Sequence, residues 1–173
     1  LFYGMGKAKL QAELGVSKEK ANELFTIYHE RVPFVKSLMN SVSNRAQQRG
    51  QIRTLLGRLC RFHLWEPNQF GIHKALPFDQ ARQEYGAGIK RAYTYKALNK
   101  LIQGSAADMT KKSMLELYKE GIVAHIQVHD ELDISVEDDK KAEQIKQIME
   151  SAVELEIPNK VDYESGKNWG DIK

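Results

Sequence analysis

The tripeptide His129-Asp130-Glu131 has side chains that could bind a divalent metal ion. Apolar residues alternate with polar ones on both sides of it, through residues 126–136, and this pattern predicts the two strands of a β-hairpin. The expected tip contains no Gly, Pro or Asn, the residues that favour tight turns. Carboxylates are hard oxygen ligands, and Mg²⁺ is typically held by one or two of them together with substrate phosphates. The tip is therefore a candidate metal site, because a purely structural hairpin gains nothing from two adjacent acids.

One carboxylate by itself makes a poor metal site. Two-metal phosphoryl chemistry needs acids from at least two chain segments, which hold the ions about 3.5–4 Å apart. Taken alone, the tripeptide is more simply explained as a solvated turn that carries acids. The other nearby acids are interpreted as structural: Asp133 as part of a solvent-facing surface, and residues 137–139 as the N-terminus of a helix.

Residues 97–108, ALNKLIQGSAAD, form a second candidate site on a predicted helix. Asn99 and Gln103 are four positions apart, so their amides share one helix face. Side-chain amides both donate and accept hydrogen bonds, which suits base edges in the minor groove of DNA. The small residues 104–107 would let another backbone approach closely. A polar stripe beside a helix-packing notch explains the same pattern equally well.

The basic residues fall into three clusters, and tyrosines are interleaved with the last of them. The clusters are Arg45 and Arg49; Arg53, Arg58 and Arg61; and Lys90, Arg91, Lys96 and Lys100, with Tyr93 and Tyr95. Arginine and lysine suit phosphate contacts, and aromatic rings suit base stacking. The net charge of only +3 says little, and a solvated protein surface remains the alternative for each cluster.

The elements that would position these residues are mostly helical. Ser17 is expected to cap one helix, Pro33 to open the next and Gly50 to end it. The remaining segments are a hairpin at 51–62 that turns near Gly57, an irregular loop at 64–88, a helix at 89–119 with a bend or close approach at Gly104, the acidic hairpin, a helix at 138–153 and an edge strand at 160–165. Helices with a small antiparallel sheet define an α+β fold class.

Composition narrows the class of protein further. The chain has 173 residues, of which 42% are hydrophobic and 28% charged, as in a globular protein. Its single cysteine, Cys60, excludes an internal disulfide framework. The sequence has no long apolar run and no signal peptide, so we expect a cytoplasmic protein without a membrane partner. The first residues, LFYGMG, include no initiator methionine at position 1, which suggests a chain that begins inside a larger protein.

Taken together, these segments resemble the C-terminal part of family A DNA polymerases, in a phage-like variant. The matching stretches occur in the family's order and cover essentially the whole chain: FYGMG at 2–6, TLLGR at 54–58, LNKLIQGSAAD at 98–108, VHDE at 128–131 and SGKNW at 165–169. VHDE matches motif C of the family, and FYGMG matches the end of its fingers helix. Five ordered matches are far more specific than any one of them.

The resemblance implies a role for the acidic tripeptide. Asp130 would be the motif C aspartate, which shares two Mg²⁺ ions with a second aspartate from motif A. Glu131 would be an auxiliary acid, and His129 would contact the primer terminus. The implied reaction is attack by a primer 3′-OH on the α-phosphate of a dNTP, with the metal ions stabilising nucleophile and leaving group.

The resemblance also implies residues that contact primer–template DNA. Gln103 and Asn99 would read the minor groove of the nascent pair and the template side, and Tyr3 would stack near the template base. Arg58 belongs to the TLLGR match and is expected to contact DNA. Bacterial members have an arginine four positions before the asparagine, where this chain has Tyr95, and Arg91 is expected to replace it.

The chain departs from the family in two further respects: motif A and its aspartate are not found in it, and neither are the fingers-helix Lys and Arg that would hold the dNTP triphosphate. Isolated, it should therefore not polymerise DNA. We expect a fragment with a fingers portion and connecting helix at 1–120 and a palm portion at 121–173. A processivity factor stays open as a partner of the full-length protein.

Other classes of function remain to be distinguished. A non-catalytic module that binds primer–template DNA would need the basic clusters and Gln103 but no second aspartate. A metal-dependent nuclease would need further acids near Asp130, and the sequence has none at a credible spacing. In a purely structural protein, replacing Asp130 with Asn would change nothing beyond stability.

Overall fold

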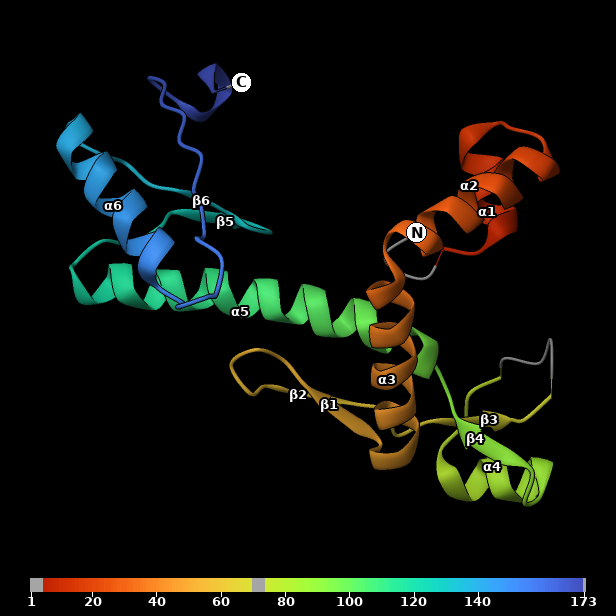
Figure 1. Cartoon of the computed structure of the whole chain (residues 1–173). Coiled ribbons are helices and arrows are strands. Elements are labelled where there is room, and N and C mark those ends of the chain that lie inside the picture. The colour runs from red at the N-terminus through yellow and green to blue at the C-terminus, as the bar shows by residue number, and fades with distance from the viewer. Residues whose placement is uncertain (1–4, 70–73, 173) are drawn as a thin grey trace. The chain divides into compact units, whose positions relative to one another are not determined.

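The computed structural model describes residues 5–69 and 74–172. The chain divides into two compact units, an N-terminal unit, Leu1–Gln103, and a C-terminal unit, Gly104–Lys173. In chain order, the elements are α1 (Lys7–Leu14), α2 (Lys18–Arg31), α3 (Pro33–Arg49), β1 (Gln51–Arg53), β2 (Leu59–Arg61), β3 (Trp65–Pro67), α4 (Phe78–Tyr85), β4 (Ile89–Arg91), η1 (Thr94–Lys96), α5 (Ala97–Lys119), β5 (Ile126–Val128), β6 (Glu131–Asp133), α6 (Asp139–Ser151) and η2 (Trp169–Asp171) (Figure 1). Helices with short antiparallel strand pairs confirm the predicted α+β class.

Local capping residues set the ends of α2 and α3 as predicted. Ser17 caps α2 by accepting a hydrogen bond from the backbone N–H of Lys20 at 3.2 Å. Pro33 occupies the first turn of α3, where a backbone N–H would have no hydrogen-bond partner within the helix, so its absence costs nothing. Gly50 ends α3 with φ at 68°, a left-handed conformation that glycine adopts without a steric penalty. These three residues therefore confirm the predicted helix ends.

The core of the N-terminal unit joins α3 to the β1–β2 hairpin and to the first turns of α5. Its buried residues are Val42, Ala46, Ile52, Phe62, Ala97 and Leu98. The hairpin pairs Gln51 with Arg61 and turns through Gly57 at φ 87°, as predicted. Leu98 is 2% exposed, and burying a leucine side chain contributes about 1.5–3 kcal/mol. This packing holds the start of α5 in a defined orientation within the unit.

The segment predicted as an irregular loop contains a strand and a helix, so that prediction is wrong in part. Strand β3 pairs with β4, opposing Trp65 to Arg91, and α4 lies between them in sequence. The Trp65 and Phe78 rings meet edge to face with their centroids 5.1 Å apart. Three-residue strands show no alternation pattern, and only their pairing partners define them. Because β4 and η1 come first, α5 begins at Ala97, several residues after the predicted start.

The C-terminal unit packs α6 and the β5–β6 hairpin on the second half of α5. Its buried cluster is Leu117, Ile122 and Ile145, with Leu132 and Ile134 partly buried against it. Asp138 caps α6 by accepting from Lys141 N–H at 2.7 Å, which confirms the predicted helix. The predicted edge strand does not form, because residues 160–165 have no strand pairing in the structure.

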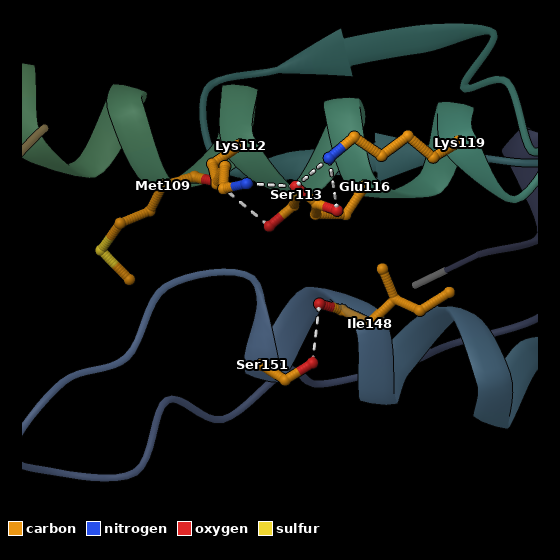
Figure 2. Close-up of polar contacts among 7 residues, drawn as sticks. All are labelled: Met109, Lys112, Ser113, Glu116, Lys119, Ile148 and Ser151. Atoms are coloured by element: carbon orange, nitrogen blue, oxygen red, sulfur yellow. Dashed lines mark hydrogen bonds and ion pairs between the residues drawn. The ribbon is translucent and has the colours of Figure 1, made fainter.

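Polar side chains line the sides of α5 and α6 in this unit (Figure 2). Lys112 and Lys119 both pair with Glu116, the latter at 3.0 Å, and Ser151 Oγ donates to the Ile148 carbonyl at 3.3 Å. Helix α5 runs 23 residues and continues through Gly104 without a break. In the part of the chain that the structure describes, no helix is both long and apolar enough to cross a membrane.

Candidate functional site

The acidic tripeptide lies at the tip of the β5–β6 hairpin, which closes in a two-residue turn. Strands β5 and β6 are antiparallel and oppose Val128 to Glu131, which leaves His129 and Asp130 as the turn. His129 has φ at 52°, a left-handed conformation that costs a non-glycine residue about 1–2 kcal/mol. The Gln127 side chain donates to the His129 carbonyl at 3.1 Å and so helps to hold this turn. A strained turn maintained in this way projects Asp130 from the end of the hairpin.

The tip carboxylates are suitable ligands for a metal ion, but they are too few to form a complete metal site. Asp130 and Glu131 are both exposed. Among the described residues, no group of three or more His, Cys, Asp and Glu side chains is placed to hold a metal ion. Mg²⁺ accepts one or two protein carboxylates when phosphates and waters complete its shell. The donors therefore fit a shared Mg²⁺ site that needs oxygen ligands from elsewhere.

The acids that follow the tip differ in their surroundings. Asp133 is half-buried, and its Oδ2 is buried with no hydrogen-bond partner among the described residues. The prediction of a solvent-facing Asp133 is therefore wrong, and burying an unpaired carboxylate oxygen has a free-energy cost. Glu137, Asp138 and Asp139 are exposed at the start of α6, as predicted.

An open groove of about 740 Å³ lies at the other end of the β5–β6 hairpin from Asp130. His125 and Ser135 line it, with His125 Nε2 and Ser135 Oγ 3.1 Å apart. None of the three tip residues lines the groove. The chemistry of the tip is therefore that of an exposed surface, not of an enclosed pocket.

Asn99 and Gln103 lie one turn apart on α5, in the N-terminal unit. The Gln103 side chain is exposed, whereas Asn99 is half-buried. The Asn99 Oδ1 atom is buried and has no hydrogen-bond partner within the described residues. An unsatisfied buried acceptor costs about 1–3 kcal/mol. Gln103 is thus open to a ligand, and Asn99 retains an acceptor that the described residues do not satisfy.

The Arg91 side chain is bound by other residues of the chain. Its Nε donates to the Gln47 carbonyl at 3.2 Å and its Nη1 to the Phe62 carbonyl at 3.0 Å. Its guanidinium lies 4.5 Å from the Trp65 ring centroid. Gly50 packs so closely that a Cβ there would lie 2.6 Å from Arg91 Cζ. These contacts join β4 to the end of α3, to Phe62 and to β3, and they favour a structural role for Arg91 over the expected DNA contact.

Arg58 lies in the turn of the β1–β2 hairpin. Gly57 N–H donates to the Thr54 carbonyl at 2.9 Å, and Thr54 N–H donates to the Arg58 carbonyl at 3.0 Å. This closed turn exposes the side chains of Leu55, Leu56 and Arg58. The backbone of TLLGR is therefore ordered by its own hydrogen bonds. Tyr3, the remaining predicted contact, lies outside the described residues.

The elements around the amide-bearing face share a feature that sequence reasoning missed. Residues 31–65 and 85–107 contain eleven Lys and Arg residues and no Asp or Glu. These stretches include α3, β1, β2, β4, η1 and the first turns of α5. A basic surface without interspersed acids attracts polyanions such as nucleic acid. The signal was present in the sequence as a gap in the acidic residues, not as a cluster of basic ones.

An acidic hairpin tip and a basic unit that carries side-chain amides suit a protein that binds a divalent metal ion and nucleic acid. The chain belongs to DNA polymerase family A, whose sequence profile matches residues 1–171. It is 37% identical to the DNA-directed DNA polymerase of Pseudomonas phage M6 over 85% of the chain and 19% of the phage protein. It is 32% identical to DNA polymerase I of Bacillus caldotenax over 100% of the chain and 19% of that enzyme.

The fold agrees with this membership. The structure matches the POL domain of Pol1 from M. smegmatis, solved in complex with DNA primer-template and dNTP, with a TM-score of 0.73 and 27% identity. The match covers 99% of this chain and 29% of that domain. The chain spans about a fifth of the length of the curated relatives it matches, 19% in both cases above. The family predicted from the ordered motifs is therefore confirmed.

Proposed function

We propose that this chain contributes the motif C half of the active site, and part of the DNA-binding surface, to a template-dependent DNA polymerase. The reaction would transfer a nucleotide from a dNTP to a primer 3′-OH. The observation that carries the proposal is the exposed Asp130 at the tip of a strained two-residue turn, within a chain that belongs to DNA polymerase family A. A turn of this kind is costly for folding, and such strain concentrates at functional positions.

Asp130 is the residue that would hold Mg²⁺, and Glu131 would be an auxiliary acid beside it. When bound, the metal would stabilise negative charge on the attacking and leaving oxygens. Because the described residues form no cluster of three metal ligands, a second aspartate would come from another polypeptide segment, as the family resemblance implies. His129, held next to Asp130 by the turn, would contact the primer terminus.

Primer–template DNA and a dNTP are the proposed partners. The exposed Gln103 amide and the unsatisfied Asn99 Oδ1 would meet base edges, and Arg58 and Tyr3 would contact the DNA. The acid-free basic stretches support phosphate binding in this unit. We propose fingers and connecting helix for residues 1–120 and palm for 121–173. The bacterial and phage relatives support action in the cytoplasm of a bacterial or phage-infected cell.

A chimaera tests the proposal, with residues 1–171 replacing the aligned segment of the Bacillus caldotenax enzyme. We expect Asp130→Asn to reduce primer extension at least about 100-fold, because a carboxylate ligand of the metal ion that would stabilise charge on the reacting phosphate is lost. Binding of primer–template DNA should stay within about twofold, since one exposed carboxylate contributes little to it. Asp162→Asn makes the same chemical change at another exposed carboxylate and should leave extension unchanged.

The outcomes separate the two functions that remain. Extension that survives Asp130→Asn would refute the assignment of Asp130. A wild-type chimaera that binds primer–template DNA but does not extend it would instead favour the non-catalytic DNA-binding module, for which the basic stretches and Gln103 suffice.

A further inference from the structure

Two tyrosine rings and a lysine gather at the start of α5. The Lys96 Nζ lies 5.2 Å from the centroid of the Tyr93 ring and 5.6 Å from that of the Tyr95 ring. Tyr95 is 59% exposed, so its ring is not part of the core. An exposed aromatic ring beside a cation is the combination by which proteins stack on bases and contact the adjoining phosphates.

The backbone under this pair is anchored to α3. Ser43 Oγ donates to the Thr94 carbonyl at 2.9 Å. The Gln47 amide, oriented to accept from Arg91 N–H at 2.8 Å, donates to Thr94 Oγ1 at 3.2 Å. These contacts hold Tyr93 at φ 61°, a left-handed conformation that a bulky residue adopts only where its surroundings enforce it. The exposed ring is therefore presented from a rigid support.

Tyr95 precedes the two amides of α5, on the 3-10 turn η1 that leads into this helix. η1 continues into α5 at Ala97, which has helical dihedral angles, so positions 95, 99 and 103 follow one another at intervals of four residues. Residues four apart share a helix face. At 1.5 Å per residue, the span from 95 to 103 is about 12 Å, or three to four stacked bases. An exposed ring thus lies just before α5, and the exposed Gln103 amide lies two turns into that helix.

The charge around the ring favours a polyanion. Lys96 and Lys100 follow it in sequence, and no acidic residue occurs anywhere in 85–107. Lys100 is itself exposed while its Nζ lies 5.2 Å from the Phe62 ring centroid. A ring stacks only on a base whose π-face is uncovered, and inside a duplex both faces are covered by neighbouring pairs. The partner that fits is therefore a single-stranded segment.

We propose that Tyr95, supported by Lys96, stacks on an unpaired DNA base next to the duplex that this unit binds. The inference rests on the proposed function and adds to it a contact with the single-stranded template. It separates the two tyrosines by role: Tyr93 is part of the support, and Tyr95 is the contact.

Binding of the whole chain to two labelled DNAs tests this. One is a primer–template with a 5′ overhang that carries 2-aminopurine at the first unpaired position, and the other is a blunt duplex of equal length. We expect Tyr95→Ala and Tyr95→Leu to weaken binding of the overhang DNA about tenfold, with loss of 2-aminopurine quenching, and to leave the blunt duplex within about twofold. Tyr95→Phe keeps the ring and should bind as wild type.

Tyr118→Ala is the matched control, because Tyr118 is also on α5 and is 68% exposed. Equal affinities of the Tyr95→Ala and Tyr118→Ala chains for the overhang DNA would overturn the inference while the proposed function stands. So would an equal loss on overhang and blunt DNA. Failure of the wild-type chain to bind either DNA would instead count against the DNA-binding function itself.

Discussion

The two units of the chain carry opposite charge. Leu1–Gln103 contains 17 Lys and Arg against 7 Asp and Glu, a formal net charge of +10. Gly104–Lys173 contains 9 Lys and Arg against 16 Asp and Glu, a formal net charge of −7. The total of +3 hides this division. An overall charge near neutrality therefore does not argue against nucleic-acid binding when the opposite charges are segregated along the chain.

The division matches the chemistry proposed for each unit. The basic unit carries amides and aromatic rings, which suit a long polyanion with exposed base edges. The acidic unit carries the Asp130 tip, whose carboxylates would repel phosphate unless a divalent cation lies between them. Affinity for DNA and the chemical step would thus depend on different units.

The packing of the two units can be compared at two glycines with similar backbone conformations, one in each unit. Gly50 and Gly121 have similar φ values, 68° and 73°, but only Gly50 is crowded by another side chain, Arg91. We expect Gly50→Ala to lower the free energy of unfolding by about 2–4 kcal/mol, from backbone strain together with the clash. Gly121→Ala meets open space and should cost about 1–2 kcal/mol, from strain alone.

Urea denaturation of the two variants measures this difference. The prediction assumes that moving the Arg91 side chain costs free energy, because two hydrogen bonds to carbonyls and a contact with Trp65 would be lost. Equal destabilisation by the two substitutions would show that Arg91 yields, and would reopen a direct DNA contact for it.

Removal of basic residues from the basic unit should weaken DNA binding, whereas removal of basic residues from the acidic unit should not. We expect the triple change Arg58→Ala, Lys96→Ala and Lys100→Ala to weaken primer–template binding about tenfold or more. It should also make the slope of log affinity against log salt less steep by about 2–3, because three counterion-releasing contacts are lost. Titration of labelled DNA at several salt concentrations gives both quantities.

The matched triple in the acidic unit is Lys140→Ala, Lys146→Ala and Lys167→Ala, which removes the same charge. We expect it to leave the salt slope unchanged. If both triples lowered the slope equally, binding would follow net charge, and the separation of roles between the units would be wrong.

The smallest expected effect is electrostatic and lies on α5 (Figure 2). Hydrogen bonds from Lys112 and then Lys119 lower the pKa of Glu116 from its ordinary value of 4.5. The resulting stabilisation is present above pH 4.5 and is lost as the pH falls through the lowered pKa. Glu116→Gln should therefore lower the melting temperature slightly at pH 7 and not at all well below pH 4.5. Glu154→Gln, at an exposed position, is the control and should not change the melting temperature at either pH. If Glu116→Gln still lowered the melting temperature in acid, the cause would be lost packing and not the lost charge.

Prediction from the sequence worked best where neighbouring residues decide the structure. Ser17, Pro33 and Gly50 set helix ends through hydrogen bonds and dihedral preferences within one turn of the chain. The β1–β2 hairpin and the α6 helix follow from the same local signals. By contrast, β3 and β4 have three residues each and are defined by pairing with each other across more than twenty positions, so no local pattern indicated them.

The sequence by itself determined the family, through five ordered motifs, the residue types at the hairpin tip and on α5, and the segregation of charge. Only the tertiary structure decided how individual side chains are used. Arg91 binds carbonyls 44 and 29 positions away in the chain, and Asp133 is half-buried instead of facing solvent. The physical reason is that charge and hydrogen-bonding capacity are properties of a residue, whereas burial and the choice of partner depend on segments that meet only when the chain folds.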